Sequence, residues 1–284
     1  MHLARPILAI LLLVLAPCLA LAQSATIETY GSGPKVFTLA TGSPGELGLL
    51  KVLGETFAKS NGATLKWLKA GTGESLDLLK ARHVDMVMVH APAKVDQAVK
   101  DGWAIKKTLI GSNEFFIVGP AADPAKVAAA KTAVQAYQDI AKAKAPILSR
   151  GDNSGTHQKE MAIWKAAGIE PSGPWYIVTR EFMTATLKRA QDESGYFMTD
   201  SSTWVAEKKN LPGLTILFQG DKMLVNTYHA LAQPAGATPG AETAAAFIDF
   251  VASEKGQDII RGFGKAEYGE ALYNDAAYAK KYDQ

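Results

Sequence analysis

The sequence predicts an α/β protein that folds as two lobes, with mixed sheets and a hinge made of strands. Short apolar runs typical of strands alternate along most of the chain with stretches of helical periodicity. Two of these runs, at 84–90 and 115–118, are almost continuously apolar, as is typical of strands buried on both faces. No low-complexity linker separates the two halves, so we expect strands rather than a flexible tether to connect them.

The first half of the chain contains three strand–helix units. Apolar residues from Leu47 to Phe57 recur at helical spacing, and Asn61-Gly62 then ends this helix. Alternation of strands with helices predicts a parallel sheet with right-handed crossovers. We predict strands at 36–41, 64–70 and 84–90, and helices at 47–61, 75–82 and 95–100.

The second half continues the alternation. Gly119-Pro120 ends the buried strand at 115–118, and alanine-rich helical sequence follows to about residue 144. A helix that starts near residue 154 runs to about residue 167. We predict further strands at 145–148, 175–178, 196–199, 214–218 and 224–232, and further helices at 182–192, 202–208, 241–253 and 255–263.

The N-terminus has the three parts of a secretory signal peptide. Arg5 supplies the positive charge, an apolar run follows from Ile7 to Leu21, and Ala20-Leu21-Ala22 matches a cleavage site. We assign residues 1–22 to a signal peptide and expect a periplasmic protein, with lipidation of Cys18 as an alternative. We predict that residues 23–113 and 219–284 form lobe one and that residues 114–218 form lobe two.

Composition and charge exclude several classes of partner and chemistry. The net charge is only +2, with no basic stripe, which makes nucleic acid and membrane surfaces poor partners. Cys18 is the only cysteine, and the five histidines are not spaced as metal ligands. We therefore expect no cofactor, no metal and no enzymatic activity.

The most informative segment runs from Ser149 to His157. It follows a predicted strand and starts a predicted helix, so free backbone N–H groups, two hydroxyls and the helix dipole converge there. Arg150 adds a guanidinium with several donors, although an ordinary helix cap is the alternative explanation for the hydroxyls. This density of donors favours a site for a small oxyanion. We assign as ligand-binding residues Arg150, Ser154, Gly155 and Thr156.

A second candidate turn, at residues 41–45, connects the first predicted strand to its helix. Its glycines permit close approach of a ligand to the backbone, and its hydroxyls can donate; a plain turn is the alternative. Ligands of open α/β sheets bind beyond the carboxyl ends of strands, so we expect this turn to face the 149–157 segment across a cleft. To the ligand-binding set we add Thr41, Gly42, Ser43 and, from a later helix start, Thr184.

Other residues have weaker signals. Thr72 and His90 follow predicted strands and could reach the cleft, but a connecting turn and a structural histidine explain them equally well or better. A hydrolase that uses Ser154 and His157 is the alternative from a different functional class. Ser154 lacks the glycine-flanked context of a nucleophile elbow, which argues against that alternative.

Several segments, in order along the chain, carry a family resemblance: Leu39–Thr41, Val89–Pro92, Asn113–Pro120, Ser149–His157, Ala185–Leu187 and Lys255–Gly264. In these segments the chain resembles the periplasmic solute-binding proteins of ABC importers, and most closely the tungstate-binding TupA-like group. The resemblance implies a type II periplasmic-binding-protein fold that closes around its ligand. It also implies a monomer that presents the ligand to a membrane permease.

The resemblance also implies roles for individual residues. It implies that the oxyanion is bound by Thr41, Ser43, Arg150, Ser154 and Thr156. The chain departs from the family in two places. The 42–46 turn lacks most of the family's threonine hydroxyls and brings Glu46 toward the site, and the 199–203 segment lacks the family's arginine.

The sequence therefore predicts an exported protein that captures a small oxyanion, such as tungstate or molybdate, between its lobes for ABC-type import. Two other ligand classes stay open. One is phosphate, whose proton Asp152 would accept unless it instead orients Arg150, and the other is a small organic anion. A sensor that presents its bound form to a receptor is the alternative to an importer component.

Overall fold

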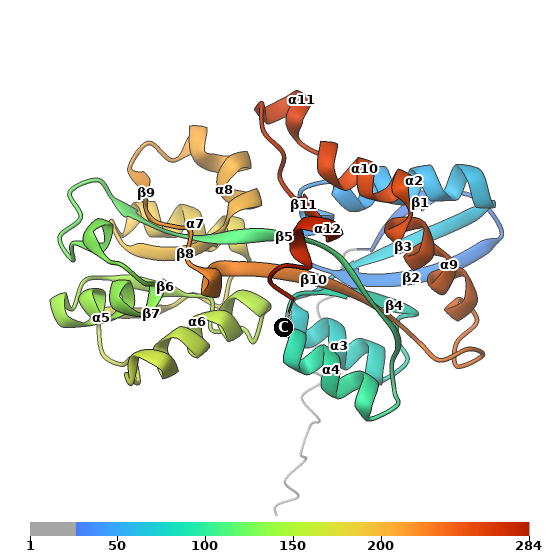
Figure 1. The fold of residues 1–284 in the computed structure, drawn as a ribbon, viewed down its shortest axis with the longest axis horizontal. Helices are drawn as coiled ribbons and strands as arrows, with labels where there is room; N and C mark the ends of the chain where they lie inside the picture. The colour runs from blue at the N-terminus through green and yellow to red at the C-terminus, as the bar shows by residue number, and fades with distance from the viewer. Residues whose placement is uncertain (1–26, 284) are drawn as a thin grey trace, which may run out of the picture.

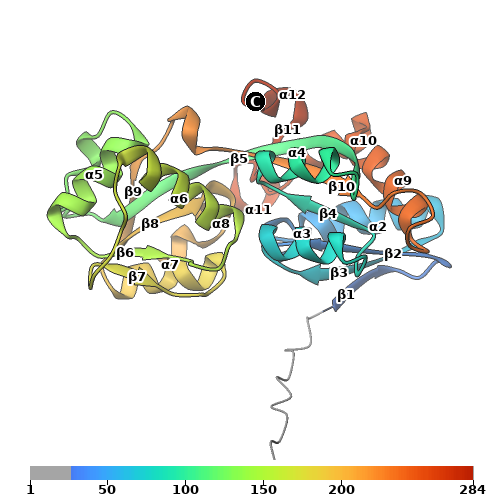
Figure 2. The same ribbon diagram turned by 90° about the horizontal axis from the view of Figure 1, so that it is seen from below.

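The computed structural model describes residues 27–283, so the predicted signal peptide and Cys18 lie outside the described range. Two α/β lobes lie side by side, connected by two long strands (Figure 1). In each lobe, helices cover both faces of the sheet (Figures 1 and 2). The predicted fold class is thus confirmed. Across residues 27–283, the helices are too short or too polar to cross a bilayer.

Lobe one contains a mixed sheet. β2 pairs in parallel with β3 on one side and with β4 on the other, as the strand–helix alternation predicts. β1, which the hydrophobic pattern did not reveal, pairs antiparallel with β3 at the edge. The strands are β1 (Ile27–Gly31), β2 (Lys35–Thr41), β3 (Ala63–Lys69) and β4 (Met86–Val89).

The helices of lobe one connect these strands and cover them. α2, α9 and α10 lie on one face of the sheet, and α3 and α4 lie on the other (Figure 1). They are α1 (Ser43–Glu46), α2 (Leu49–Asn61), α3 (Thr72–Lys80), α4 (Pro92–Lys100), α9 (Ala241–Ala252) and α10 (Glu254–Gly262).

Lobe two repeats the arrangement. β6 pairs in parallel with β7 and β8, and helices α5 and α6 lie on the face opposite α7 and α8 (Figure 1). The strands are β6 (Ile147–Ser149), β7 (Tyr176–Val178), β8 (Tyr196–Asp200) and β9 (Leu214–Phe218). The helices are α5 (Ala133–Ala143), α6 (Gly155–Ala167), α7 (Met183–Asp192) and α8 (Ser201–Glu207).

Two strands, β5 (Ile105–Pro120) and β10 (Val225–Ala232), connect the lobes. They pair antiparallel up to Glu114, which lies opposite Val225. From Phe115 onward, β5 pairs instead with β8 and β9 of lobe two. β5 therefore belongs to both lobes, and its change of partner supports the lobe boundary that we propose between residues 113 and 114.

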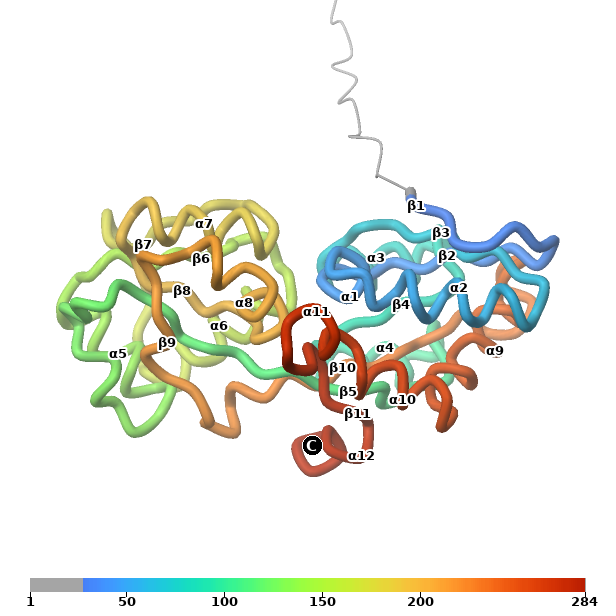
Figure 3. Tube along the Cα trace, turned by 90° about the horizontal axis from the view of Figure 1, so that it is seen from above, coloured from blue at the N-terminus to red at the C-terminus, as the bar shows by residue number. Residues whose placement is uncertain are grey.

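The C-terminal segment lies across this connection. β11 (Asn274–Asp275) pairs antiparallel with β5, and α12 (Ala276–Ala279) follows it. Figure 3 shows α12 beside the strands that connect the lobes, whereas α11 (Lys265–Tyr268) stands away from them at the top of Figure 1. The buried His229 of β10 lies with its Nε2 atom 3.0 Å from Oδ1 of Asp283, which holds the end of the chain against the hinge.

Each lobe has its own apolar core. In lobe one, the ring of Phe247 lies 5.3 Å from that of Phe37 and 5.2 Å from that of Phe57, measured between centroids. In lobe two, the rings of Tyr137 and Trp164 are 4.5 Å apart and both side chains are fully buried. Separate cores allow two lobes to move as units about their connection.

The structure corrects two predicted elements. β5 has 16 residues, far more than the run predicted at 115–118, because charged residues such as Lys106 and Lys107 interrupt the apolar pattern of its first half. The alanine-rich segment after Pro120 forms a regular α-helix only from Ala133 onward. Asp123 and Lys126 have positive φ angles of 42° and 60°, a backbone conformation that no α-helix contains.

A carboxyl group is buried in lobe two, behind strand β6. Glu160 of α6 is 3% exposed. It accepts hydrogen bonds from Ser149 Oγ at 2.7 Å, Tyr176 Oη at 2.8 Å and Trp164 Nε1 at 3.1 Å. Burial raises the pKa of Glu160 to about 7, although the three hydrogen bonds act in the opposite direction. This group therefore changes its charge near neutral pH.

Replacing Glu160 by Gln should change how stability depends on pH. The folded-state pKa lies above the ordinary glutamate value, so the folded protein binds the proton more tightly than the unfolded chain does. The resulting stabilisation is complete below about pH 4.5 and is lost as the pH rises through about 7. The free energy of unfolding of the wild type, relative to Glu160→Gln, should fall by on the order of 2–3 kcal/mol between about pH 5 and pH 8.

Urea titrations of both proteins at the two pH values measure this difference. Glu170→Gln, at an exposed position of the same lobe, is the matched control and should follow the wild type at both pH values. Parallel stability profiles for the wild type and Glu160→Gln would contradict the expected proton uptake.

Candidate functional site

A small polar pocket lies between the two lobes. Its lobe-one wall follows the carboxyl ends of β2, β3 and β4, and its lobe-two wall follows those of β6 and β7. This is where open α/β sheets bind their ligands. The pocket is lined by Thr41, Gly42, Ser43, Pro44, Glu46, Gly71, Thr72, His90, Arg150, Ser154, Phe182 and Tyr228.

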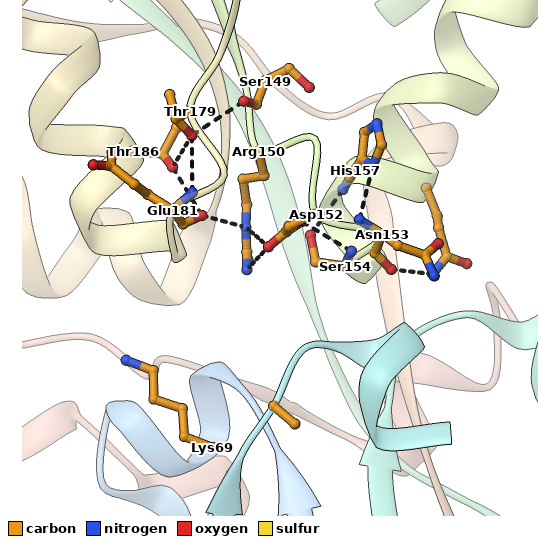
Figure 4. Close-up of polar contacts among 12 residues, drawn as sticks. Lys69, Ser149, Arg150, Asp152, Asn153, Ser154, His157, Thr179, Glu181 and Thr186 are labelled. Atoms are coloured by element: carbon orange, nitrogen blue, oxygen red, sulfur yellow. Dashed lines mark hydrogen bonds and ion pairs between the residues drawn. The ribbon is translucent and has the colours of Figure 1, made fainter. Parts of the chain in front are cut away.

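Arg150 belongs to the lobe-two wall, and contacts within its own lobe fix its guanidinium (Figure 4). Nη2 and Nε donate to Oδ2 of Asp152 at 2.6 and 3.0 Å, and Nε also donates to the carbonyl of Glu181 at 3.2 Å. The side chain is 6% exposed, and Cζ lies 5.2 Å from the centroid of the Phe182 ring. A guanidinium held in this way offers its remaining donors to a ligand with little further loss of conformational freedom.

The tight turn between β6 and α6 brings Asp152 to Arg150. Gly151 and Asn153 flank Asp152 with positive φ angles of 59° and 57°. The other oxygen of Asp152, Oδ1, accepts a hydrogen bond from the backbone N–H of Ser154 at 3.0 Å. Burial acts to raise the pKa of Asp152, but the charge of Arg150 and the bonds from Ser154 outweigh it and lower that pKa. Asp152 is therefore ionised and neutralises Arg150.

Helix α6 begins at the pocket. Ser154 is its N-cap, and its Oγ accepts a hydrogen bond from the backbone N–H of His157 at 3.3 Å. Gly155 and Thr156 form the first turn behind this cap, and both are buried. The positive end of a 13-residue helix therefore lies at the pocket wall, where it favours an anion.

Two more helices begin at the pocket. Gly71 is the N-cap of α3 in lobe one, and Phe182 is the N-cap of α7 in lobe two. Neither glycine nor phenylalanine has a side-chain acceptor, so neither helix has a side-chain cap. The first-turn N–H groups of both helices lack that ordinary partner, so a ligand can take its place.

The first strand-to-helix turn supplies the rest of the lobe-one wall. Gly42 is the N-cap of α1, and Ser43 and Pro44 begin this short helix. Thr41 is 1% exposed, and its Oγ1 donates to the carbonyl of Met88 in the neighbouring strand at 2.8 Å. The Thr41 hydroxyl proton is therefore used within lobe one, which leaves Ser43 as the freer hydroxyl of this turn.

Glu46 lines the pocket and is paired with a second cation. Its Oε1 lies 2.6 Å from Nζ of Lys69, the last residue of β3. The same Nζ lies 4.2 Å from the centroid of the Phe182 ring, which belongs to the other lobe. Arg150 and Lys69 thus each have their own carboxylate partner. These two pairs add no net formal charge at the pocket, so hydrogen bonds and helix dipoles remain as the attraction for an anion.

His90 connects the pocket to the hinge strands. Its Nδ1 lies 2.7 Å from Oδ1 of Asn226, an oxygen that can only accept, so Nδ1 carries the proton. Asn226 then donates to Oδ1 of Asn113 at 2.7 Å, and Asn113 donates to Ser202 and Asp200 at 2.8 and 3.2 Å.

Burial lowers the pKa of His90 to about 4, and the positive charge of Arg150 acts in the same direction. The imidazole is therefore neutral at neutral pH.

The lobes touch each other beside the pocket. Lys94 of lobe one donates to Oδ1 of Asn153 in lobe two at 3.3 Å. A Cβ atom added to Gly73 would lie 2.4 Å from Nδ2 of Asn153, and one added to Gly155 would lie 2.2 Å from Cε1 of His90. A side chain at either glycine would need the lobes to separate. The structure therefore shows the lobes in a closed arrangement.

The structure brings most of the predicted ligand-binding residues to this pocket. Those in its lining are Thr41, Gly42, Ser43, Arg150 and Ser154. Gly155 and Thr156 lie in the first helical turn behind Ser154, and Thr184 lies in α7 outside the lining. Ligand contact stays a prediction for all of them.

The sequence-based prediction missed Phe182 and Tyr228, which also line the pocket. An aromatic residue at a helix start or within a strand gives no sequence signal for anion binding.

The geometry does not favour the hydrolase alternative. Ser154 Oγ accepts a hydrogen bond from the backbone of His157, while Nδ1 of His157 accepts one from the backbone of Asn153 at 3.0 Å. Neither bond joins the serine hydroxyl to the imidazole, as a nucleophile and its general base require.

Over residues 27–283, no group of three His, Cys, Asp or Glu side chains is arranged to hold a metal ion.

The chain is similar to known proteins in sequence. A PBP superfamily domain matches residues 28–255. The chain is 33% identical over 255 residues to the tungstate-binding protein TupA of Peptoclostridium acidaminophilum. This alignment covers 88% of the chain and 89% of that relative.

Two solved structures are similar in both sequence and fold. The tungstate ABC transporter protein from Geobacter sulfurreducens has a TM-score of 0.73 and 37% identity, covering 82% of this chain and 100% of the other. TupA from Desulfovibrio alaskensis G20 has a TM-score of 0.69 and 36% identity, covering 84% and 98%. The chain therefore belongs to the PBP superfamily and, within it, to the TupA-like family of ABC-transporter binding proteins.

Proposed function

We propose that this protein captures tungstate, or a tetrahedral dianion of similar size such as molybdate, and presents it to the permease of an ABC importer. It would do so as a monomer in the periplasm. The observation that carries the proposal is the convergence of the N-termini of α3, α6 and α7, from both lobes, on a small polar pocket beside the buried Arg150. The tungstate-binding relatives support the choice of anion.

The pocket is suited to an anion with oxygens on all sides. Backbone N–H groups of α3, α6 and α7, the Ser43 hydroxyl and the Arg150 guanidinium surround it from two lobes. Each hydrogen bond to a charged group contributes roughly 1.5–3 kcal/mol. Micromolar affinity needs about 8 kcal/mol, so a few such bonds suffice even after the costs of ordering and desolvation.

Closure of the lobes would complete the site. The donors come from both lobes, so an anion makes all its hydrogen bonds only when the lobes are together. Binding therefore shifts the population toward the closed arrangement, and β5 and β10 are the strands that would bend. A permease can then recognise the closed form as the loaded one.

Asp152 favours a fully deprotonated anion over hydrogen phosphate. Both of its oxygens already accept hydrogen bonds, from Arg150 and from the backbone of Ser154. It is thus placed as the partner of Arg150 rather than as an acceptor for a proton of the ligand. Tungstate and molybdate carry no proton near neutral pH, so they need no such acceptor.

Calorimetric titration of the purified protein with tungstate, molybdate, sulfate and phosphate tests the proposal. We expect tungstate or molybdate to bind with a Kd below about 1 μM, and phosphate to bind much more weakly. Binding of an organic carboxylate in place of every one of these oxyanions would contradict the assignment.

Replacing Arg150 by Ala should abolish this affinity. The variant loses a fixed guanidinium at the pocket wall and leaves the Asp152 charge without its partner, so we expect Kd to rise by at least about 100-fold. Arg150→Lys, which keeps the charge but not the forked donors, should recover only part of the loss. Arg189→Ala, on α7 outside the pocket lining, is the control. Unchanged affinity in Arg150→Ala with a native circular dichroism spectrum would remove Arg150 from the site.

Replacing Gly73 by Ala should weaken binding without destabilising the fold. Alanine favours a helix over glycine by up to about 1 kcal/mol, but its Cβ would meet Asn153 of the other lobe when the lobes are closed. Overpacking of this kind costs about 1–3 kcal/mol, so we expect Kd to rise roughly 5- to 150-fold while Tm stays equal or increases.

Gly262→Ala is the matched control for Gly73→Ala, because a Cβ at this position of α10 would have no atom within 4 Å. It should bind like the wild type in the same titration. Wild-type affinity in Gly73→Ala would show that the closed arrangement is not the one that holds the anion.

A further inference from the structure

One aromatic side chain at the pocket contacts cations from both lobes. Phe182 begins α7 of lobe two and lines the pocket. Its ring centroid lies 5.2 Å from Cζ of Arg150, which belongs to the same lobe. It lies 4.2 Å from Nζ of Lys69, which belongs to lobe one. The contact between Lys69 and Phe182 therefore crosses from one lobe to the other.

Lys69 is oriented toward this contact from within lobe one. Its Nζ lies 2.6 Å from Oε1 of Glu46, and the two side chains are 34% and 17% exposed. Figure 4 shows Lys69 extending from lobe one toward the part of lobe two that carries Glu181 and Arg150. The lysine is thus fixed by one lobe and makes its aromatic contact with the other.

We propose that Lys69 and Phe182 form an interlobe latch that stabilises the closed, ligand-bound state, with Glu46 as the residue that positions Lys69. The inference rests on the proposed function, since it concerns how long the captured oxyanion stays in the pocket. Lys69 and Phe182 are carried by different lobes, so opening separates them and the contact is lost. Phe182 is itself part of the pocket wall, so its displacement also opens the way to the anion.

The latch has a distinct kinetic consequence. An incoming anion meets the open protein, in which the contact does not exist, so its association rate does not depend on the contact. Release requires opening, so removing the contact speeds dissociation. A cation–π contact at a partly exposed site is worth enough to change an equilibrium by roughly 2- to 30-fold.

A double-mutant cycle isolates the contact. Lys69→Met, Phe182→Leu and the double variant are compared with the wild type by stopped-flow tryptophan fluorescence with tungstate or molybdate. Lys69 also pairs with Glu46, and Phe182 also contacts Arg150. Each of these separate effects is the same whether or not the other residue is changed, so it cancels in the cycle. We expect each single change to raise the dissociation rate about 2- to 30-fold, and the double variant to dissociate more slowly than the product of the two single effects predicts.

Conservative variants and a control pair sharpen the test. Lys69→Arg and Phe182→Trp keep a cation over an aromatic ring and should keep the slow release. Lys80 and Trp103 form a matched pair within lobe one, with Nζ 5.8 Å from the ring, and Lys80→Met should leave both rates unchanged.

Two results would overturn the latch proposal even if the wild type binds the oxyanion tightly. One is full additivity of the two single changes, and the other is an effect confined to the association rate. Absence of oxyanion binding in the wild type is a different result, because it would overturn the proposed function and the latch with it.

Discussion

The antiparallel pairing of β5 with β10 is the constraint on which the rest of the structure depends. Both sheets are extended from this ribbon, so it fixes the direction in which the parallel strands of each lobe end. The turns after β2, β3 and β4 and those after β6 and β7 therefore reach the same pocket. The ribbon also carries Asn113 and Asn226, whose side-chain amides are buried and hydrogen-bonded to each other. A hinge motion must keep these amides satisfied, which favours bending of the ribbon over its rupture.

Charge compensation determines how such a pocket can select its ligand. A guanidinium as deeply buried as that of Arg150 would be costly without a carboxylate beside it, and Asp152 meets that need. Lys69 and Glu46 balance each other in the same way. With the cations already neutralised, net charge contributes little to the choice among anions. The choice then depends on the positions of fixed donors, and these match an anion of one size and shape better than others.

Local parts of the site could be predicted from the sequence, and parts that depend on distant pairing could not. The Ser149–Thr156 segment contains a strand end, a tight turn and a helix cap in continuous order, so its chemistry follows from its own residues. Thr41 is different: its position at the end of a strand suggested a free hydroxyl, yet β4 lies beside β2 and its Met88 carbonyl accepts that hydrogen bond. The roles of Lys69 and Phe182 depend on which strand ends the closed lobes bring together, and no local pattern encodes that.

The titratable groups around the pocket leave recognition to permanently charged residues and fixed dipoles. His90 lies at the pocket wall, but burial and the neighbouring guanidinium keep it neutral, so it donates to Asn226 and adds no charge that varies with pH. Burial also raises the pKa of Asp200, but this carboxyl lies behind the hinge amides and already accepts two bonds from Thr203. Burial raises the pKa of Glu160 to about 7, and this carboxyl is separated from the pocket by Ser149, to which it is hydrogen-bonded. Its charge therefore acts on the β6–α6 turn, both through Ser149 and through its interaction with the charge of Asp152.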